Sequence, residues 1–191
     1  FIKFDTKNEL QWYKTYGGAN DERSQDIIQT NDGGFFITGF SKSNDGDVST
    51  SFGSNDYWVA KLDIKGTIIW EKSFGFSGTD QAFSAIQTSD GGYLITGTLD
   101  VTSSSQQGND RSSLSKKHSG GDYWAVKLDS NGTKQWRRFY GGSYTDTAYD
   151  VIETDDNGYF MVGLSYSNYV DVTDNKGQYD FCCLKIYSKG F

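Results

Sequence analysis

The residues best able to do chemistry in this sequence are acidic, and they gather in stretches rich in Asp, Asn, Ser and Gly. One stretch reads Asn44-Asp45-Gly46-Asp47-Val48-Ser49, and a related one contains Asp171 and Asp174. Carboxylate oxygens in such loops are ligands that Ca²⁺ prefers. Asp and Asn also cap turns with their own side chains and need no metal to do so. Asp45 and Asp47 therefore carry two interpretations, turn formation and calcium binding, of which we favour turn formation.

A second group of candidate residues either recurs in a repeated sequence pattern or lies close to these acidic stretches. Three acids occupy one position of a repeated pattern: Glu22, Asp80 and Asp146. Three tyrosines fall near the later Asp-rich stretches: Tyr144, Tyr166 and Tyr169. Exposed aromatic rings stack on sugars and anchor protein partners. We assign the three acids, Tyr166 and Tyr169, with the four loop aspartates, to a candidate binding surface.

No catalytic constellation emerges from the sequence. The single histidine, His118, lies in the polar stretch Ser112–Gly121, which we expect to be a mobile loop, and a triad needs a fixed partner. Cys182 and Cys183 are adjacent and offer no zinc spacing. The acids recur from copy to copy, whereas a catalytic pair is normally unique. We therefore expect a protein that is not an enzyme.

The chain is built from three copies of one unit. Trp12, Trp70 and Trp136 lie 58 and 66 residues apart (70 − 12 and 136 − 70), and each is followed four positions later by an aromatic residue and glycine. A second block containing Ile-x-Thr-x-Asp follows each of them at constant offset, and a third block begins at Asp56, Asp122 and Asp180. Three ordered blocks in three copies indicate a repeat protein.

Each copy is expected to form four short antiparallel strands. In the first copy these are Gln25–Thr30, Phe35–Ser41, Tyr57–Asp63 and Ile68–Phe74. Asp32-Gly33 and Asn131-Gly132 mark tight hairpin turns, the second of type I′, because glycine accepts a positive φ. Helical periodicity is absent, so the fold class is all-β. Four strands joined in order within 58 to 66 residues are typical of a β-propeller blade.

Several recurring residues have an expected structural role. The repeated Trp residues should pack between blades, in keeping with an aromatic content of 16%. Lys61, Lys127 and Lys185 recur in the third strand, and we interpret them as solvated edge positions that discourage strand pairing. Neighbouring strand residues point to opposite faces, so we expect two unpaired thiols at Cys182 and Cys183 rather than a strained vicinal disulfide.

The order of the strands decides which connections share a face. The loops between second and third strands should lie together with the links between units, and this face carries all the variation in loop length. Long loops on a rigid scaffold are where binding usually resides, so we place the candidate binding surface there. The longest loop, Asp100–Gly121, includes the basic run Lys116-Lys117 and few apolar residues. We expect it to be the most mobile segment and to contribute little to folding.

The repeated blocks resemble the bacterial β-propeller family known as SBBP repeats, especially its variants in large secreted surface proteins of gliding and related Gram-negative bacteria. The family pattern joins Tyr-Gly-Gly, Ile-x-x-Thr-x-Asp-Gly-Gly-Tyr and Asp-x-Trp-Val-x-Lys-Leu-Asp, and it covers nearly all of residues 1–191. Phe76, Asn157 and the Cys182-Cys183 pair depart from it. The resemblance implies export, often by type IX secretion with a separate sorting domain.

These observations predict about three blades of a larger or incomplete propeller within residues 1–191. Residues 1–24 should form the end of a preceding blade and a link, 25–74 and 83–140 two complete blades, and 149–191 a blade that lacks its last strand. Three blades do not easily close a ring, so we expect the chain to belong to a longer array whose other blades are its partners. Its opening at Phe1, without Met or a leader, suggests a processed product or a piece of a longer protein.

Composition narrows the function. A net charge of −7 and a pI near 4.6 oppose binding to nucleic acid, and no apolar run is long enough for a membrane insertion. We expect a secreted or cell-surface module for adhesion that binds a surface protein or a glycan without catalysis. The alternative is a structural spacer array within a large secreted protein, and a hydrolase of extracellular polysaccharide ranks third. No cofactor is expected beyond the calcium considered above.

Overall fold

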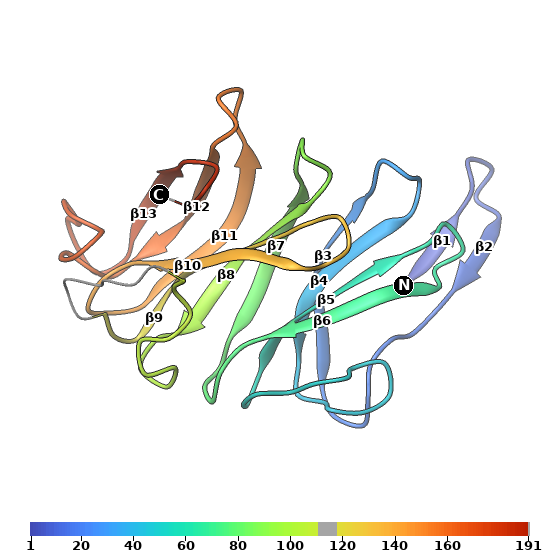
Figure 1. Ribbon diagram of the computed structural model, residues 1–191, viewed down its shortest axis with the longest axis horizontal. Coiled ribbons are helices and arrows are strands. Elements are labelled where there is room, and N and C mark those ends of the chain that lie inside the picture. The colour runs from blue at the N-terminus through green and yellow to red at the C-terminus, as the bar shows by residue number, and fades with distance from the viewer. Residues whose placement is uncertain (111–117, 191) are drawn as a thin grey trace.

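The computed structural model describes residues 1–110 and 118–190, and in them the chain is all-β, as predicted. Its thirteen strands form four antiparallel sheets (Figure 1). Sheet 1 contains β1 (Ile2–Phe4) and β2 (Leu10–Tyr13). Sheet 2 contains β3 (Glu22–Gln29), β4 (Phe35–Ser41), β5 (Asp56–Leu62) and β6 (Ile68–Phe74). Sheet 3 contains β7 (Gln81–Gln87), β8 (Tyr93–Asp100), β9 (Gly121–Leu128) and β10 (Lys134–Tyr140). Sheet 4 contains β11 (Asp146–Glu153), β12 (Tyr159–Ser165) and β13 (Asp180–Ile186).

In every sheet the neighbouring strands are consecutive in the chain, so each sheet is a meander. The expected distribution of two, four, four and three strands is confirmed. The described residues include no helix, and none of them could therefore cross a membrane as a helix. The assignment of the sheets as propeller blades stays a prediction, because the described sheets do not close a ring.

The sheets pack face to face in chain order, and alternate side chains of one strand serve its two neighbours. On β5, Trp58, Ala60 and Leu62 point toward sheet 1. Tyr57 and Val59 point the other way, into the cluster between sheets 2 and 3. A further cluster joins sheets 3 and 4. Sheet 3 is thus covered on both faces, which explains why the seven residues Asp122 to Leu128 of β9 are all buried.

The repeated tryptophans lie between sheets, and the expected packing role is confirmed. Each one contacts an aromatic ring at the start of the second strand of the next sheet. The pairs are Trp12 with Phe35, Trp70 with Tyr93 and Trp136 with Tyr159, with ring centroids 5.9, 5.8 and 6.3 Å apart. Such tilted and edge-on contacts between rings add to the stabilisation from burial.

The hairpin turns differ in type from the prediction. In the turn between β9 and β10 the Gly132 amide donates to the Asp129 carbonyl at 3.1 Å, so Ser130 and Asn131 are the central residues. Gly132 has a φ of 80°, whereas Asn131 does not have a positive φ. Type I′ requires a positive φ at both central residues, so that prediction is wrong. Glycine follows the turn and does not occupy its centre.

Two of the three recurring lysines are not solvated edge residues, whereas Lys185 is exposed on the edge strand β13. Lys61 and Lys127 lie on interior strands and are 4% and 1% exposed. The Lys127 ammonium donates to Asp90 at 2.9 Å and to the Leu128 carbonyl at 3.0 Å. Lys61 pairs with Asp32 in the same way, and this hydrogen bond lowers the pKa of Asp32 to about 2.

Each lysine therefore ties the third strand to the turn between the first two, and Lys185 does so with Asp156. The edge-position prediction is wrong for Lys61 and Lys127, because the ion pair with the turn replaces solvation of the ammonium group.

The first strand of each complete copy begins earlier than expected. Strand β3 starts at Glu22 rather than Gln25, and its register with β4 shifts between Ser24 and Asp26. The equivalent shift occurs in β7 and β11. A bulge inserts one residue into the alternation of inward and outward side chains. The alternation of inward and outward side chains is therefore regular only after the bulge, so the sequence pattern predicts too late a start for the strand.

Candidate functional site

The long loops and the links between sheets lie on one side of the molecule, as predicted. We call this side the long-loop face: loops 42–55, 101–110 with 118–120, and 166–179, and links 14–21, 75–80 and 141–145. Main-chain hydrogen bonds join loop to link, such as Ser54 N–H to the Gly78 carbonyl at 3.0 Å and Tyr166 N–H to the Thr145 carbonyl at 3.0 Å. The turns that join β3 to β4, β7 to β8 and β11 to β12 point to the opposite side, at the top of Figure 1.

The recurring acids fasten the links to the sheets. Each accepts the backbone N–H of the residue four positions earlier: Glu22 from Gly18 at 3.0 Å, Asp80 from Phe76 at 2.8 Å and Asp146 from Gly142 at 2.9 Å. Each carboxylate also accepts a hydrogen bond from the second strand of its own sheet or from the residues just after that strand. The donors are the Ser41 hydroxyl for Glu22, the Asp100 N–H for Asp80, and the Ser165 and Ser167 hydroxyls for Asp146. Asp80 and Asp146 are fully buried. The structure places all three in the scaffold, where Asp80 and Asp146 are inaccessible and Glu22 is half-buried.

A second acid lies beside the clamping acid at the junction of sheets 2 and 3 and at that of sheets 3 and 4, and sequence reasoning did not single it out. Asp56 and Asp122 begin the third strands and are buried. A Cβ on Gly141 would lie 2.5 Å from Asp122 Oδ1 and 2.5 Å from Asp146 Oδ2, so only glycine fits between the two carboxylates. Burial raises the pKa of Asp80 and of Asp122 to about 7. The sequence does contain a signal for this second acid, because every third block begins with an aspartate.

His118 is buried, and the expectation of a mobile loop position is wrong. It is 1% exposed, and its Nδ1 lies 2.5 Å from Asp122 Oδ2. The ring packs edge-on against Phe139 with centroids 4.9 Å apart. Asp171 of the next long loop lies 3.8 Å from Nε2. The imidazole thus sits between two carboxylates from two different sheets.

The position of His118 has a local explanation in the repeats. The acids equivalent to Asp122 are Asp56 and Asp180, and each accepts the backbone N–H of the residue four positions earlier, Phe52 or Lys176. In sheet 3 the residue four positions earlier is His118, and its side chain, in place of the backbone, hydrogen-bonds the acid. The acid at this position is therefore hydrogen-bonded in all three sheets: by a backbone N–H in sheets 2 and 4, and by a side chain in sheet 3.

Several described residues of the loop between β8 and β9 pack against sheet 3. Val101 and Ser104 are buried, and Trp124 Nε1 donates to the Gly108 carbonyl at 2.8 Å. The Gln106 amide hydrogen-bonds both the N–H and the carbonyl of His118. The expectation that this loop contributes little to folding is wrong for these residues. Leu114 and the basic run Lys116-Lys117 lie outside the described residues.

Asp45 and Asp47 act as caps for the link between sheets 1 and 2. Asp45 Oδ1 accepts the Ala19 N–H at 2.8 Å, and Asp47 Oδ2 accepts the Gly17 N–H at 3.1 Å. Both bonds reach a link that is 26 or 30 residues away in the chain, whereas the turn interpretation expects each side chain to bond the backbone of its own turn. In residues 1–110 and 118–190 no three His, Cys, Asp or Glu side chains gather in a way that could hold a metal ion.

The later aspartates have different surroundings. Asp171 Oδ2 faces the Gly141 N–H at 3.5 Å as well as His118. Asp174 is exposed and has a φ of 68°, at the bend of its loop. The acids named from the sequence therefore do not form one cluster: they are distributed over three junctions, and most of them bind the main chain.

The tyrosines do come together. The rings of Tyr144 and Tyr166 lie 5.1 Å apart and perpendicular, and Tyr166 and Tyr179 are also 5.1 Å apart. All three are exposed, as is Tyr169. Two main-chain bonds hold the first pair, from Tyr144 N–H to Ser167 Oγ at 3.0 Å and from Tyr166 N–H to the Thr145 carbonyl at 3.0 Å. Tyr179 was not expected from the sequence. We call Tyr144, Tyr166 and Tyr179 the tyrosine cluster.

A hollow of about 490 Å³ begins directly beside this cluster. Ser165 and Asp180, the chain neighbours of Tyr166 and Tyr179, lie in its wall. The rest of the wall combines polar and apolar side chains: Val172, Thr173, Asp174, Asn175, Lys176, Phe181, Cys182 and Cys183. Both thiols are free, as predicted. Aromatic rings next to amide and carboxylate groups form a surface that can bind a polar ligand with apolar faces.

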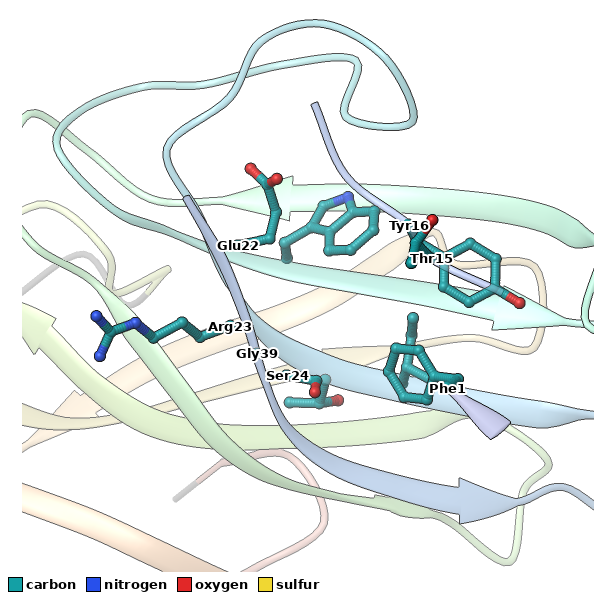
Figure 2. Close-up of a pocket in the computed structure, with 10 residues that line it drawn as sticks. Phe1, Thr15, Tyr16, Glu22, Arg23, Ser24 and Gly39 are labelled. Carbon is teal, nitrogen blue, oxygen red and sulfur yellow. The ribbon is translucent and has the colours of Figure 1, made fainter. Parts of the chain in front are cut away.

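A separate cavity of about 190 Å³ lies at the junction of sheets 1 and 2 (Figure 2). Phe1 and Tyr16 lie along one side of it, and Gly39 and Ser24 come from the adjoining strands of sheet 2. Glu22, named from the sequence as a binding residue, lines this cavity.

Comparison with known proteins yields no relative: no family model matches the chain, and no curated protein matches it significantly. The resemblance to the bacterial propeller repeats stays a prediction that rests on the blocks quoted above.

Proposed function

We propose that this protein is a secreted or cell-surface β-propeller segment that binds a ligand without catalysis, through the tyrosine cluster and the hollow beside it. Four consecutive meanders stacked face to face are compatible with blades, since a blade is a four-stranded antiparallel meander packed between two others. The secreted location and export by type IX secretion are supported by the resemblance of the repeat blocks alone.

The observation that carries the proposal is that the tyrosine cluster is not repeated. Its three positions correspond to Asn20, Lys42 and Asn55 in the first copy and to Gly78, Asp100 and Gly121 in the second. The inter-sheet tryptophans and the clamping acids recur in all three copies. A residue required by the repeated scaffold should recur, so a cluster found once has a role beyond the scaffold.

Among the ligands expected from the sequence, the geometry favours a glycan. Tyr166 and Tyr179 offer exposed rings of the kind that stack on the apolar face of a sugar. Asp174 and Asn175 line the adjoining hollow and can accept or donate hydrogen bonds to hydroxyl groups. Few but well-placed polar groups beside aromatic walls are typical of small-molecule sites.

The proposal is tested with a glycan array probed by the intact chain. We expect reproducible hits, and we expect the double variant Tyr166→Ala with Tyr179→Ala to lose them. Tyr187→Ala is the control, because Tyr187 is also an exposed tyrosine but follows β13 at the end away from the long-loop face. Hits that survive the double variant would overturn the tyrosine cluster as the site.

If the intact chain bound no glycan and no surface protein, this result would favour the second candidate function, a structural spacer array. The clamping acids support this alternative, because they recur in every copy and fasten each link to its sheet. In a spacer the long-loop face would carry no ligand, and the tyrosine variants would differ from the parent only in stability.

A further inference from the structure

The third strand of sheet 4 differs from the other third strands at one position that faces the preceding sheet. Trp58 of β5 and Trp124 of β9 occupy this position and are 6% and 0% exposed. Each indole belongs to the cluster between its own sheet and the sheet before it. Their counterpart in β13 is Cys182, which packs toward sheet 3. A thiol is much smaller than an indole, so the junction of sheets 3 and 4 lacks volume that a tryptophan fills elsewhere.

Neighbouring residues compensate for this exchange only in part. Leu184 stands where the smaller Ala60 and Val126 stand in the other third strands, and it adds volume on the same face. Val172 nevertheless stays half-buried, whereas its counterpart Val48 is 1% exposed. A cavity of about 210 Å³ remains. It arises from the exchange of one side chain, because the position is occupied by this chain and faces sheet 3, whose four strands are all present.

This cavity adjoins the hollow beside the tyrosine cluster. Four residues line both of them: Val172, Thr173, Cys182 and Cys183. A ligand held in the hollow can therefore extend a substituent toward the place that an indole fills in the other copies. The space is sufficient for a small substituent, since an apolar cavity of about 150 Å³ holds benzene.

The walls of the cavity combine apolar surface with two kinds of hydrogen-bonding group. Leu184, Val172 and the ring of Tyr140 supply the apolar surface. The Asp171 carboxylate can accept a hydrogen bond, and the Thr173 hydroxyl can donate one. These walls suit a substituent that has an apolar end, an N–H donor and a carbonyl acceptor. They disfavour a carboxylate substituent, because Asp171 would repel it.

We propose that this cavity holds the acetamido group of an N-acetylated sugar, an inference that rests on the glycan binding proposed above. The acetyl methyl would contact Leu184 and Val172. The amide N–H would donate to the Asp171 carboxylate, and the amide carbonyl would accept from the Thr173 hydroxyl. The sugar ring would then lie in the hollow beside the tyrosine cluster. The exchange of tryptophan for cysteine thus selects the substituent that the glycan carries.

The test uses the intact chain and three tetrasaccharides on one β-1,4-linked backbone, which differ only in the group at the second carbon of each sugar. N-acetylchitotetraose carries acetamido groups, its de-N-acetylated form carries ammonium groups, and cellotetraose carries hydroxyls. We expect the acetamido form to bind about tenfold more tightly than the others, the effect of burying a methyl group and gaining a hydrogen bond. The comparison is repeated on the backbone of any other glycan that binds on the array.

Two further measurements locate the acetamido group. In the parent chain its methyl should show nuclear Overhauser contacts with the methyl groups of Val172 and Leu184. Cys182→Trp restores the residue of the other two copies, so it should fill the cavity and remove the preference for acetamido. Cys182→Trp with Leu184→Val reproduces the pair found in β9 and serves if the single variant is unstable. Tyr187→Trp adds an indole away from the long-loop face and should leave the preference unchanged.

The outcomes separate this inference from the function on which it rests. Equal binding of the matched glycans, tightest binding of the ammonium form, or array hits confined to glycans without acetamido groups would overturn the acetamido site and leave glycan binding standing. A preference that survives the filled cavity, or methyl contacts with other residues only, would also overturn it. The absence of any glycan hit would overturn both.

Discussion

The buried ammonium group of Lys127 gives a direct test of how the turns are held. Lys127→Met keeps the length and apolar stem of the side chain but removes its hydrogen bonds to Asp90 and to the Leu128 carbonyl. Hydrogen bonds that involve a charged group contribute about 1.5–3 kcal/mol, so we expect the free energy of unfolding to fall by about that amount. Urea denaturation measures it. Lys65→Met, at an exposed turn position, is the control, and an equal effect of both variants would contradict the clamp.

The buried acids predict how stability depends on pH. Burial raises the pKa of Asp80 to about 7, above the value near 3.8 that it has when unfolded. The folded protein therefore holds a proton that the unfolded chain releases, and stability falls as pH rises from about 4 to about 7. Asp122 acts in the same direction. Melting temperatures between pH 4 and 8 should decrease across this window and level off above it.

Asp80→Asn should flatten that profile, because the amide does not titrate, whatever its effect on absolute stability. Asp155→Asn, at an exposed aspartate, should leave the slope unchanged. A profile that rises from pH 4 to 7 in the parent chain would show that the carboxylates ionise more easily in the folded state.

Among the elements, the loop between β8 and β9 carries the clearest prediction. Shortening it by removal of 103–119 would delete Ser104, Gly108 and His118, which pack on sheet 3 or hydrogen-bond to it. Trp124 would lose its acceptor and Asp122 its imidazole partner. We expect a loss of more than about 2 kcal/mol in the free energy of unfolding. A loss below about 0.5 kcal/mol in urea denaturation would show that these contacts do not stabilise the fold.

Some features of the strands and loops could be predicted from the sequence, and others could not. The strand order, the hairpin positions and the shared face of the long loops were predictable, because they depend on local alternation and on turn residues that recur three times. The burial of Lys61 and of His118 was not, because Lys61 pairs with an aspartate 29 residues away, and the His118 ring packs on Phe139 and faces Asp171 of the next long loop. Lys61 and Asp32 do recur together in every copy with opposite charges, and that joint recurrence was the available signal.

The candidate site was predictable only in part. The sequence indicated the long-loop face and Tyr166, but it could not show that Tyr144 and Tyr179 meet Tyr166, since these residues come from a link and from two ends of a loop. It also grouped acids that the structure separates. Position within a repeat predicts which face a residue belongs to, whereas contact across a face depends on the path of loops without a regular pattern.

At the scale of the whole molecule, the stacking of sheets predicts where the backbone opens first. Sheet 3 is packed between two neighbours, while sheet 1 has only two strands and exposes Ile2, Phe4 and Leu10. Two-stranded sheets have little stability of their own. Amide hydrogen exchange should therefore be slowest in β8 and β9 and fastest in β1 and β2. Uniform protection across all four sheets would indicate a single cooperative unit instead.

The contacts between sheets have a consequence for how such a chain can evolve. Trp12 and Trp136 donate across their junctions to the carbonyls of Ile64 and Ser188, and Tyr16 and Tyr140 donate to those of Gly66 and Gly190. A main-chain carbonyl is the same whatever side chain its residue carries. Unequal recombination that adds, removes or reorders a unit therefore creates new neighbours whose acceptors are already in place, and the loops of each unit are free to diverge without breaking the joint.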